Sequence, residues 1–167
     1  MKRQKYMLLT NLHSTKYWIE EVFEEIKDDL AFDIDVIYVG GKVYTSSSQF
    51  VCFDGYLMDT IIPTPKTIRG REVQSGTVLV ANRETHCTKL SIVSKIRSSN
   101  YDNVINVMDL DPANQLLFDW LLDMANVPLS QKTGILPLTS LQCNNLNMFG
   151  KLDKELLIIL LKQIPFL

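Results

Sequence analysis

A single carboxylate, Asp59, follows an apolar stretch that begins at Phe53, and Pro63 stands four residues further on. The stretch has the length and composition of a buried strand, which in an α/β protein belongs to a parallel sheet. Open α/β sheets hold their sites at the carboxyl ends of their strands. A carboxylate in that place can act as a nucleophile or as a ligand of a divalent cation. Asp59 is therefore the first candidate for a functional residue.

Other polar residues follow other predicted strands and would meet Asp59 at the same edge of the sheet. These residues are Asn11, His13, Asn82, His86 and Asp109. Together with Asp59 they contain no complete catalytic mechanism. We therefore do not expect an enzyme, and we predict a candidate ligand site without catalytic residues, cofactor or metal ion. The residues assigned to this site are Asp59, Asn11, His13, Asn82 and Asp109.

The composition is that of an ordinary globular protein, with 167 residues of which 46% are hydrophobic and 22% charged. A formal net charge of −2 argues against binding nucleic acid through bulk charge. The longest apolar run, residues 156–161, is too short to cross a bilayer. The three cysteines form no C-x-x-C motif, which favours reduced thiols. We expect a cytoplasmic protein that does not bind membranes and would contact nucleic acid only through a separate domain.

The elements that would position the polar residues alternate between strands and helices. Apolar runs predict strands at residues 6–12, 34–39, 50–58, 77–81 and 104–107. Apolar residues at helical spacing predict helices after the first, fourth and fifth of these strands. The pattern predicts a three-layer, flavodoxin-like α/β domain with a five-stranded parallel sheet. The segment 63–76 is predicted to be a loop because it contains prolines, glycines and charges.

The end of the chain differs in character, which places a predicted domain boundary near residue 126. Residues 1–126 would form the α/β domain, and residues 127–167 a helical extension. The last predicted helix, residues 152–164, is apolar on most sides, as is typical of a helix buried in a core or against a partner. We predict that it packs on the α/β domain or on a partner, with a homodimer formed through it and the helix beginning at Asp111. The candidate interface residues are Leu116, Trp120, Leu156 and Leu160.

Residues 5–126 resemble the receiver domain of response regulators. The order of the predicted elements and the stretch Leu57-Met58-Asp59-x-x-x-Pro63 carry the resemblance. It implies a phosphoacceptor role for Asp59 and a part in signal transduction or transcription regulation. Receiver domains also need an acidic pair after the first strand, a hydroxyl after the fourth and a lysine after the fifth.

The chain departs from the receiver pattern at each of these positions. The first strand is followed by Asn11-Leu12-His13, the fourth ends in Ala81-Asn82, and the fifth in Met108-Asp109. Without the acidic pair and the lysine, phosphoryl transfer to Asp59 would lose its electrostatic stabilisation. We therefore predict a pseudo-receiver with a vestigial phosphoacceptor site, a regulatory or interaction module that dimerises. The alternative is a small α/β enzyme, a phosphotransfer component or a nucleotide-binding protein with its site at the same edge.

Overall fold

Two units, defined by their internal contacts, make up the chain in the computed structural model. Unit 1 consists of Met1–Tyr38, Ser99–Asp111 and Pro128–Leu167, and unit 2 of Val39–Ser98 and Pro112–Val127. The units alternate along the sequence, so residues 1–126 do not form one of them. The structure describes residues 3–39, 42–44, 60–63, 66–73, 78–81, 83–98, 101–109, 112–129, 133–136, 138 and 154–167.

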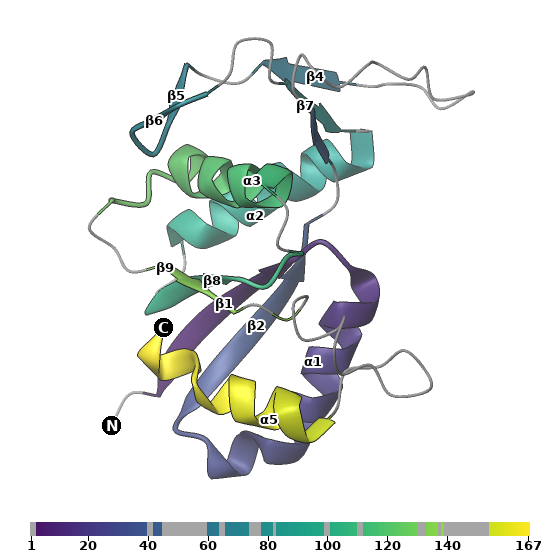
Figure 1. Cartoon of the computed structure of the whole chain (residues 1–167), viewed down its shortest axis with the longest axis vertical. Coiled ribbons are helices and arrows are strands. Elements are labelled where there is room, and N and C mark those ends of the chain that lie inside the picture. Colours follow the sequence, from purple (N-terminus) through teal and green to yellow (C-terminus); the bar gives the residue numbers. More distant parts are fainter. Residues whose placement is uncertain are drawn as a thin grey trace. The chain divides into compact units, whose positions relative to one another are not determined.

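The sheet of unit 1 is parallel, with its strands in the order β2-β1-β8-β9 (Figure 1). The strands are β1 (Gln4–Thr10), β2 (Phe32–Tyr38), β8 (Asn103–Asn106) and β9 (Thr133–Ile135). The predicted α/β class and parallel sheet are confirmed, and the arrangement is compatible with a flavodoxin-like fold. The described residues form four parallel strands rather than five. The strand predicted at residues 50–58 lies outside the described residues.

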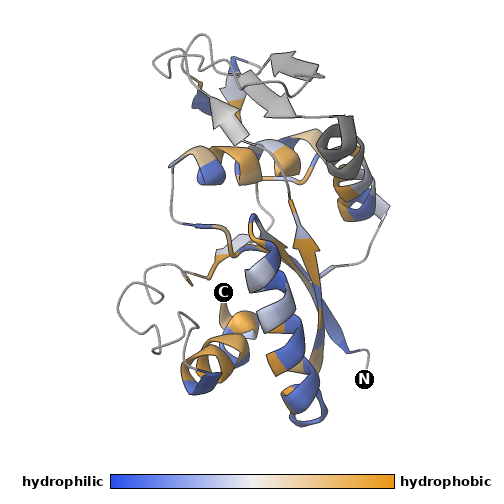
Figure 2. Ribbon diagram, turned by 90° about the vertical axis from the view of Figure 1, so that its right-hand side faces the viewer, coloured by the Kyte–Doolittle hydropathy of each residue, from blue (hydrophilic) through white to orange (hydrophobic). Residues whose placement is uncertain are grey.

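Helices α1 (His13–Ile26) and α5 (Lys154–Lys162) lie on the same side of this sheet (Figure 2). Each continues into a short 3-10 helix, η1 (Lys27–Asp29) after α1 and η2 (Ile164–Phe166) near the end of the chain. Apolar side chains of both helices form one core with those of β1, β2 and β8. The predicted last helix therefore folds back on the sheet of its own chain. Among the described helices, none has both the length and the apolar character that crossing a bilayer requires.

Two of the four residues predicted to form an interface are covered within the chain. Trp120 is only 3% exposed and Leu160 only 9%, while Leu116 and Leu156 are half-buried. Leu160 belongs to the core shared by α1, α5 and the sheet. An apolar helix can be buried by its own chain as well as by a partner, and here the chain itself buries it. The burial of Trp120 and Leu160 gives no support to an interface through these two side chains, and the homodimer stays a prediction.

Unit 2 contains an antiparallel sheet of three strands in the order β3-β7-β4 and a two-stranded hairpin, β5-β6. Its elements are β3 (Lys42–Tyr44), β4 (Thr60–Pro63), β5 (Thr67–Ile68), β6 (Arg71–Glu72), β7 (Val78–Ala81), α2 (Arg83–Ser98) and α3 (Pro112–Met124). The hairpin lies within the segment that was predicted to be a loop. It was missed because strands of two residues show no periodicity.

The strand β7 was predicted to belong to the parallel sheet, and this prediction is wrong. It pairs with β3 and with β4, antiparallel to both. An apolar run indicates a buried strand but not the direction of its neighbours. β7 is the middle strand of its sheet, whereas Pro63 lies on the outer strand β4, where a missing backbone N–H is tolerated.

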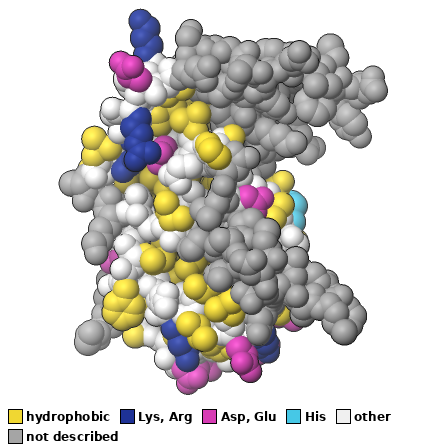
Figure 3. Space-filling model, in the orientation of Figure 1, with side chains coloured by type: hydrophobic (Ala, Val, Ile, Leu, Met, Phe, Trp, Pro, Cys, Tyr) yellow, Lys and Arg dark blue, Asp and Glu magenta, His cyan; other side chains and the backbone are white. Residues whose placement is uncertain are grey.

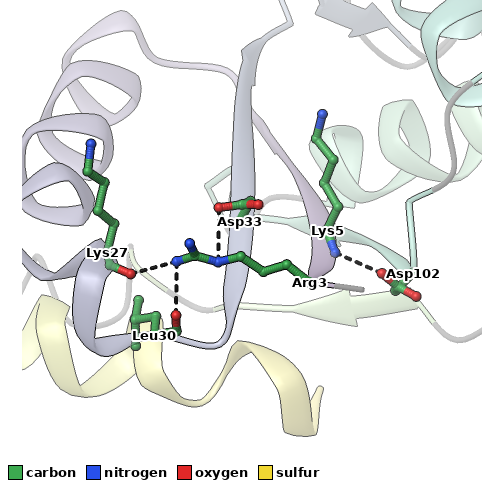
Figure 4. A network of polar contacts seen from close by, with 6 residues as sticks. All are labelled: Arg3, Lys5, Lys27, Leu30, Asp33 and Asp102. Atoms are coloured by element: carbon green, nitrogen blue, oxygen red, sulfur yellow. Dashed lines mark hydrogen bonds and ion pairs between the residues drawn. The ribbon is translucent and has the colours of Figure 1, made fainter. Parts of the chain in front are cut away.

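Charged side chains hold the amino end of the parallel sheet (Figure 4). Nη2 of Arg3 donates to the carbonyl oxygens of Lys27 and Leu30, at 2.6 and 2.9 Å. Nε of Arg3 lies 3.2 Å from the carboxylate of Asp33 in β2. The backbone N–H of Lys5 donates to the carboxylate of Asp102, just before β8, at 2.7 Å. These contacts join β1 to both neighbouring strands and so help to fix the alignment of their opposite ends.

Gly134 of β9 marks a close approach of the end of the chain to the sheet. A Cβ atom on Gly134 would lie 2.8 Å from Cβ of Leu167 and 3.3 Å from Cγ1 of Ile105. We predict that Gly134→Ala lowers the free energy of unfolding by about 1–3 kcal/mol, because a closely packed site has no room for a further methyl group. Urea unfolding would measure the change.

The control for this prediction is a double variant. Leu167→Gly removes the facing Cβ atom, so Gly134→Ala with Leu167→Gly should lose less stability than the two single changes added together. A neutral effect of Gly134→Ala would show that Leu167 does not pack there.

Candidate functional site at the carboxyl edge of the parallel sheet

The parallel strands of unit 1 end at one edge of the sheet. β1 ends at Thr10, β2 at Tyr38 and β8 at Asn106. β1 lies between β2, which follows it in the chain, and β8, which comes much later. The strand order therefore reverses at β1, and ligands of open α/β sheets bind at such a switch point. The segments that leave β1 and β8 stand where a site is expected.

Three of the five predicted site residues follow strands at this edge. Asn11 directly follows β1, His13 is the first residue of α1, and Asp109 follows β8. Asp59 and Asn82 lie outside the described residues, so the predicted grouping of all five is not tested. Asn82 comes after β7, which belongs to the antiparallel sheet, so the argument that assigned it to this edge no longer holds.

Asn11 and Asp109 are hydrogen-bonded to one another in both directions. Nδ2 of Asn11 donates to Oδ2 of Asp109 at 3.2 Å, and the backbone N–H of Asp109 donates to Oδ1 of Asn11, also at 3.2 Å. Both residues are half-buried. We call this arrangement the Asn11–Asp109 joint. It connects the segment after β1 with the segment after β8 and places one carboxylate at the switch point.

Two buried polar residues at the same edge were not predicted. Thr10 is fully buried, and its hydroxyl accepts a hydrogen bond from the backbone N–H of Leu12 at 3.3 Å. Asn106 is 3% exposed, and its Oδ1 accepts from the backbone N–H of Met108 at 2.9 Å. Such bonds from a side chain to the backbone two residues ahead turn the chain at the end of a strand. In the sequence Thr10 lies within the predicted strand 6–12 and Asn106 within the predicted strand 104–107, so neither stood out.

The imidazole of His13 stacks on the ring of Tyr38, with centroids 3.7 Å apart and an angle of 22° between the planes. The ring of Tyr17, one turn further along α1, lies 6.3 Å from the imidazole at 20°. His13 is exposed and Tyr17 is 64% exposed. Sequence reasoning missed Tyr38, an aromatic residue at the end of the second strand.

The described groups at this edge can make polar and stacking contacts. They include an amide, a carboxylate, an imidazole and a phenol. Within the described ranges, no group of three or more His, Cys, Asp or Glu side chains could hold a metal ion. The carboxylate can accept hydrogen bonds from a ligand, and the rings can stack on a planar one.

A second group of charged residues lies in unit 2, around the β5-β6 hairpin and the end of α3 (Figure 3). Arg69 and Gly70 form the turn of the hairpin, with φ of 47° and 76°. A turn with positive φ at both central residues matches the twist of a hairpin. Nη1 of Arg69 donates to the carbonyl oxygen of Val127 at 3.0 Å, and Nη1 of Arg71 lies 3.9 Å from Oδ2 of Asp119. The hairpin is therefore attached to α3 and to the residues that follow it.

Asp119 of α3 is the acidic partner in this attachment, and its side chain is only 16% exposed. Burial raises the pKa of its carboxyl group and outweighs three opposing effects. These are the hydrogen bond from Nε2 of Gln115, at 3.1 Å, and the charges of Arg71 and Arg69. The ionised carboxylate is therefore less favourable in the folded chain than in the unfolded one.

No model of a protein family, no curated protein and no solved structure matches this chain. Its function is therefore argued from its own residues.

The Asn11–Asp109 joint can be tested by two substitutions at one position. We expect Asn11→Ala to lower the free energy of unfolding at pH 7 by about 1–3 kcal/mol, because both hydrogen bonds are lost. Asn11→Asp should be less stable still at pH 7, since it sets two carboxylates side by side. It should regain stability as acid protonates them, which urea unfolding at several pH values would measure. Wild-type stability in Asn11→Ala would exclude a contribution from the joint.

The raised pKa of Asp119 gives a pH-dependent prediction. The stability that its protonated form contributes is present below the ordinary carboxyl range and is lost as the pH rises through the raised pKa. Asp119→Asn removes this loss and can still accept the hydrogen bond from Gln115. The variant should therefore be more stable than the wild type at pH 7, and the difference should shrink as the pH is lowered.

Thermal unfolding at several pH values would check this. The lost pairing with Arg71 should weigh little, because Arg71 is 79% exposed. Asp123→Asn is the matched control, because Asp123 is an exposed carboxylate on the same helix and its replacement should change stability little. A less stable Asp119→Asn at pH 7 would mean that the ion pair outweighs burial.

Proposed function

We propose that this chain is a receiver-like regulatory module that is not phosphorylated and that acts by binding. The observation that carries the proposal is the Asn11–Asp109 joint at the switch point of the parallel sheet. A receiver site needs an acidic pair after the first strand to hold Mg²⁺ beside the phosphoryl group. Here the residue after the first strand is an amide, and its N–H₂ group donates to the carboxylate of Asp109.

The joint argues against phosphoryl transfer, because that reaction requires a metal ion and the joint engages the carboxylate that would bind it. Mg²⁺ demands near-octahedral oxygen ligands and gives up its water reluctantly. At the described edge it would meet one carboxylate, and one oxygen of that carboxylate already accepts from Asn11. An ion there would compete with the amide of Asn11 for the same carboxylate. Without the ion, the charge that develops during phosphoryl transfer would lack its main stabilisation.

The regulatory part of the proposal rests on the likeness of residues 5–126 to receiver domains and on the parallel sheet. A fold of this class supports many functions, so the likeness alone does not determine one. The groups at the carboxyl edge add support, because a carboxylate and exposed rings suit a bound partner or ligand. We infer a role in signal transduction or transcription control, in which a partner or ligand binds at the carboxyl edge of the sheet.

Labelling with acetyl phosphate tests the proposal. The wild-type chain, incubated with acetyl phosphate and Mg²⁺, should take up no more acid-labile phosphate than Asp59→Asn. The amount would be measured by intact-protein mass spectrometry on ice, since acyl phosphates hydrolyse. Labelling of the wild type that disappears in Asp59→Asn would overturn the proposal. Asn11→Asp is the matched comparison, because it supplies one of the two carboxylates that a receiver places after its first strand.

A further inference from the structure

The chain passes between its two units at four points. At two of these points the chain leaves unit 1, each time shortly after the end of a strand of the parallel sheet. The first is the step from Tyr38 to Val39, directly after β2. The second is the step from Asp111 to Pro112, a few residues after β8. Because β2 and β8 are parallel, both segments leave unit 1 from the carboxyl edge of the sheet.

One short loop of unit 1 contacts both of these segments. Asn11 holds Asp109 by two hydrogen bonds of 3.2 Å, two residues before the step at Asp111. His13 stacks on Tyr38, the last residue before the other step, at 3.7 Å between ring centroids. Asn11 and His13 are separated by Leu12 alone. The loop after β1 therefore reaches to both neighbouring strands.

The loop is itself firmly positioned, so it can serve as an anchor. The backbone N–H of Leu12 donates to the hydroxyl of the fully buried Thr10 at 3.3 Å. The backbone N–H of Lys16 donates to the carbonyl oxygen of Leu12 at 3.1 Å and begins the hydrogen bonding of α1. The backbone N–H of Val107 donates to the carbonyl oxygen of Leu9 at 2.9 Å, which brings the segment after β8 alongside the loop.

The side chain of Asn11 is not engaged in capping α1. The N-cap of this helix is Leu12, which has no side chain that could cap, and no side-chain capping bond is formed. The amide of Asn11, one residue earlier, bonds to Asp109.

We propose that residues 11–13 form a clamp that holds the two segments by which the chain leaves unit 1 after β2 and after β8. The hydrogen bonds of Asn11 and the ring contact of His13 with Tyr38 lie within unit 1. The ring of His13 is exposed, so a molecule that binds at this edge can reach it. A ligand that displaces the ring from Tyr38, or that takes over the amide of Asn11, would loosen the segment that this side chain holds. The clamp does not depend on the regulatory function proposed above, and its test uses no phosphate.

Hydrogen–deuterium exchange of the whole chain, read by mass spectrometry, tests the clamp. In His13→Ala the backbone amides at residues 37–39 should exchange on the order of tenfold faster, and in Asn11→Ala those at residues 107–109 should do so. The double variant should show both increases. Amides at residues 4–6, near the network of Arg3, should exchange as in the wild type, because that network is at the other edge.

Two further variants separate the clamp from a general loss of stability. His13→Phe keeps a flat ring that can stack on Tyr38, so exchange at residues 37–39 should return toward the wild-type rate. Tyr17→Ala removes the other ring beside His13 and should leave both segments protected. Unchanged exchange at residues 37–39 and 107–109 in the double variant would overturn the proposal. A uniform increase over all of unit 1, with no rescue by His13→Phe, would also overturn it, because the loop would then only support the core.

Discussion

The structure of unit 1 depends on the pairing of β1 along both of its sides. β1 forms parallel ladders with β2 and with β8, which fixes where the chain lies as it leaves each strand. The side chains of Met7, Leu8 and Leu9 are fully buried, although neighbouring residues of a strand point to opposite faces. The middle of β1 therefore offers no polar group, and polar interactions are confined to its ends.

The polar interactions at the two ends of β1 differ in kind. Toward the amino edge, Arg3 contacts Asp33, and Asp35 in the middle of β2 accepts from the hydroxyl of Tyr101 and lies 3.1 Å from Nζ of Lys5. Charges there are matched by opposite charges on adjacent strands, and a ligand would have to break a connected network. At the carboxyl edge, the contacts of the described residues include the amide of Asn11 and the imidazole of His13. These are uncharged groups or groups in solvent contact rather than opposite charges on adjacent strands.

Much of the local structure could be predicted from the sequence, and the pairing of strands could not. Apolar runs identified β1, β2 and β8, and apolar residues at helical spacing identified the helices. β9 and the β5-β6 hairpin are too short to show either pattern. β7 was found as a strand but assigned to the wrong sheet, because its apolar run is equally typical of the middle strand of an antiparallel sheet. The alternation of the two units was missed for the same reason, since composition does not tell which strands are neighbours.

The candidate site was predictable to a similar degree. Asn11 and Asp109 were expected at one edge because each follows a strand, but they are 98 residues apart, and their mutual hydrogen bonds depend on geometry that the sequence does not contain. Trp120 and Leu160 were recognised as apolar helix residues, and their periodicity could not distinguish a partner from the core of their own chain.

The presence of an amide at residue 11 follows from what Asp109 requires. Asp109 offers a carboxylate that accepts and a backbone N–H that donates, and both are turned toward Asn11. An asparagine side chain carries a donor and an acceptor in one plane and can meet both at once. An aspartate could accept from the N–H, but it would set two half-buried carboxylates together and would need a cation between them. The amide thus makes the joint between β1 and β8 independent of any ion. The exposed ring of His13 is a part of the same loop that a second molecule can reach.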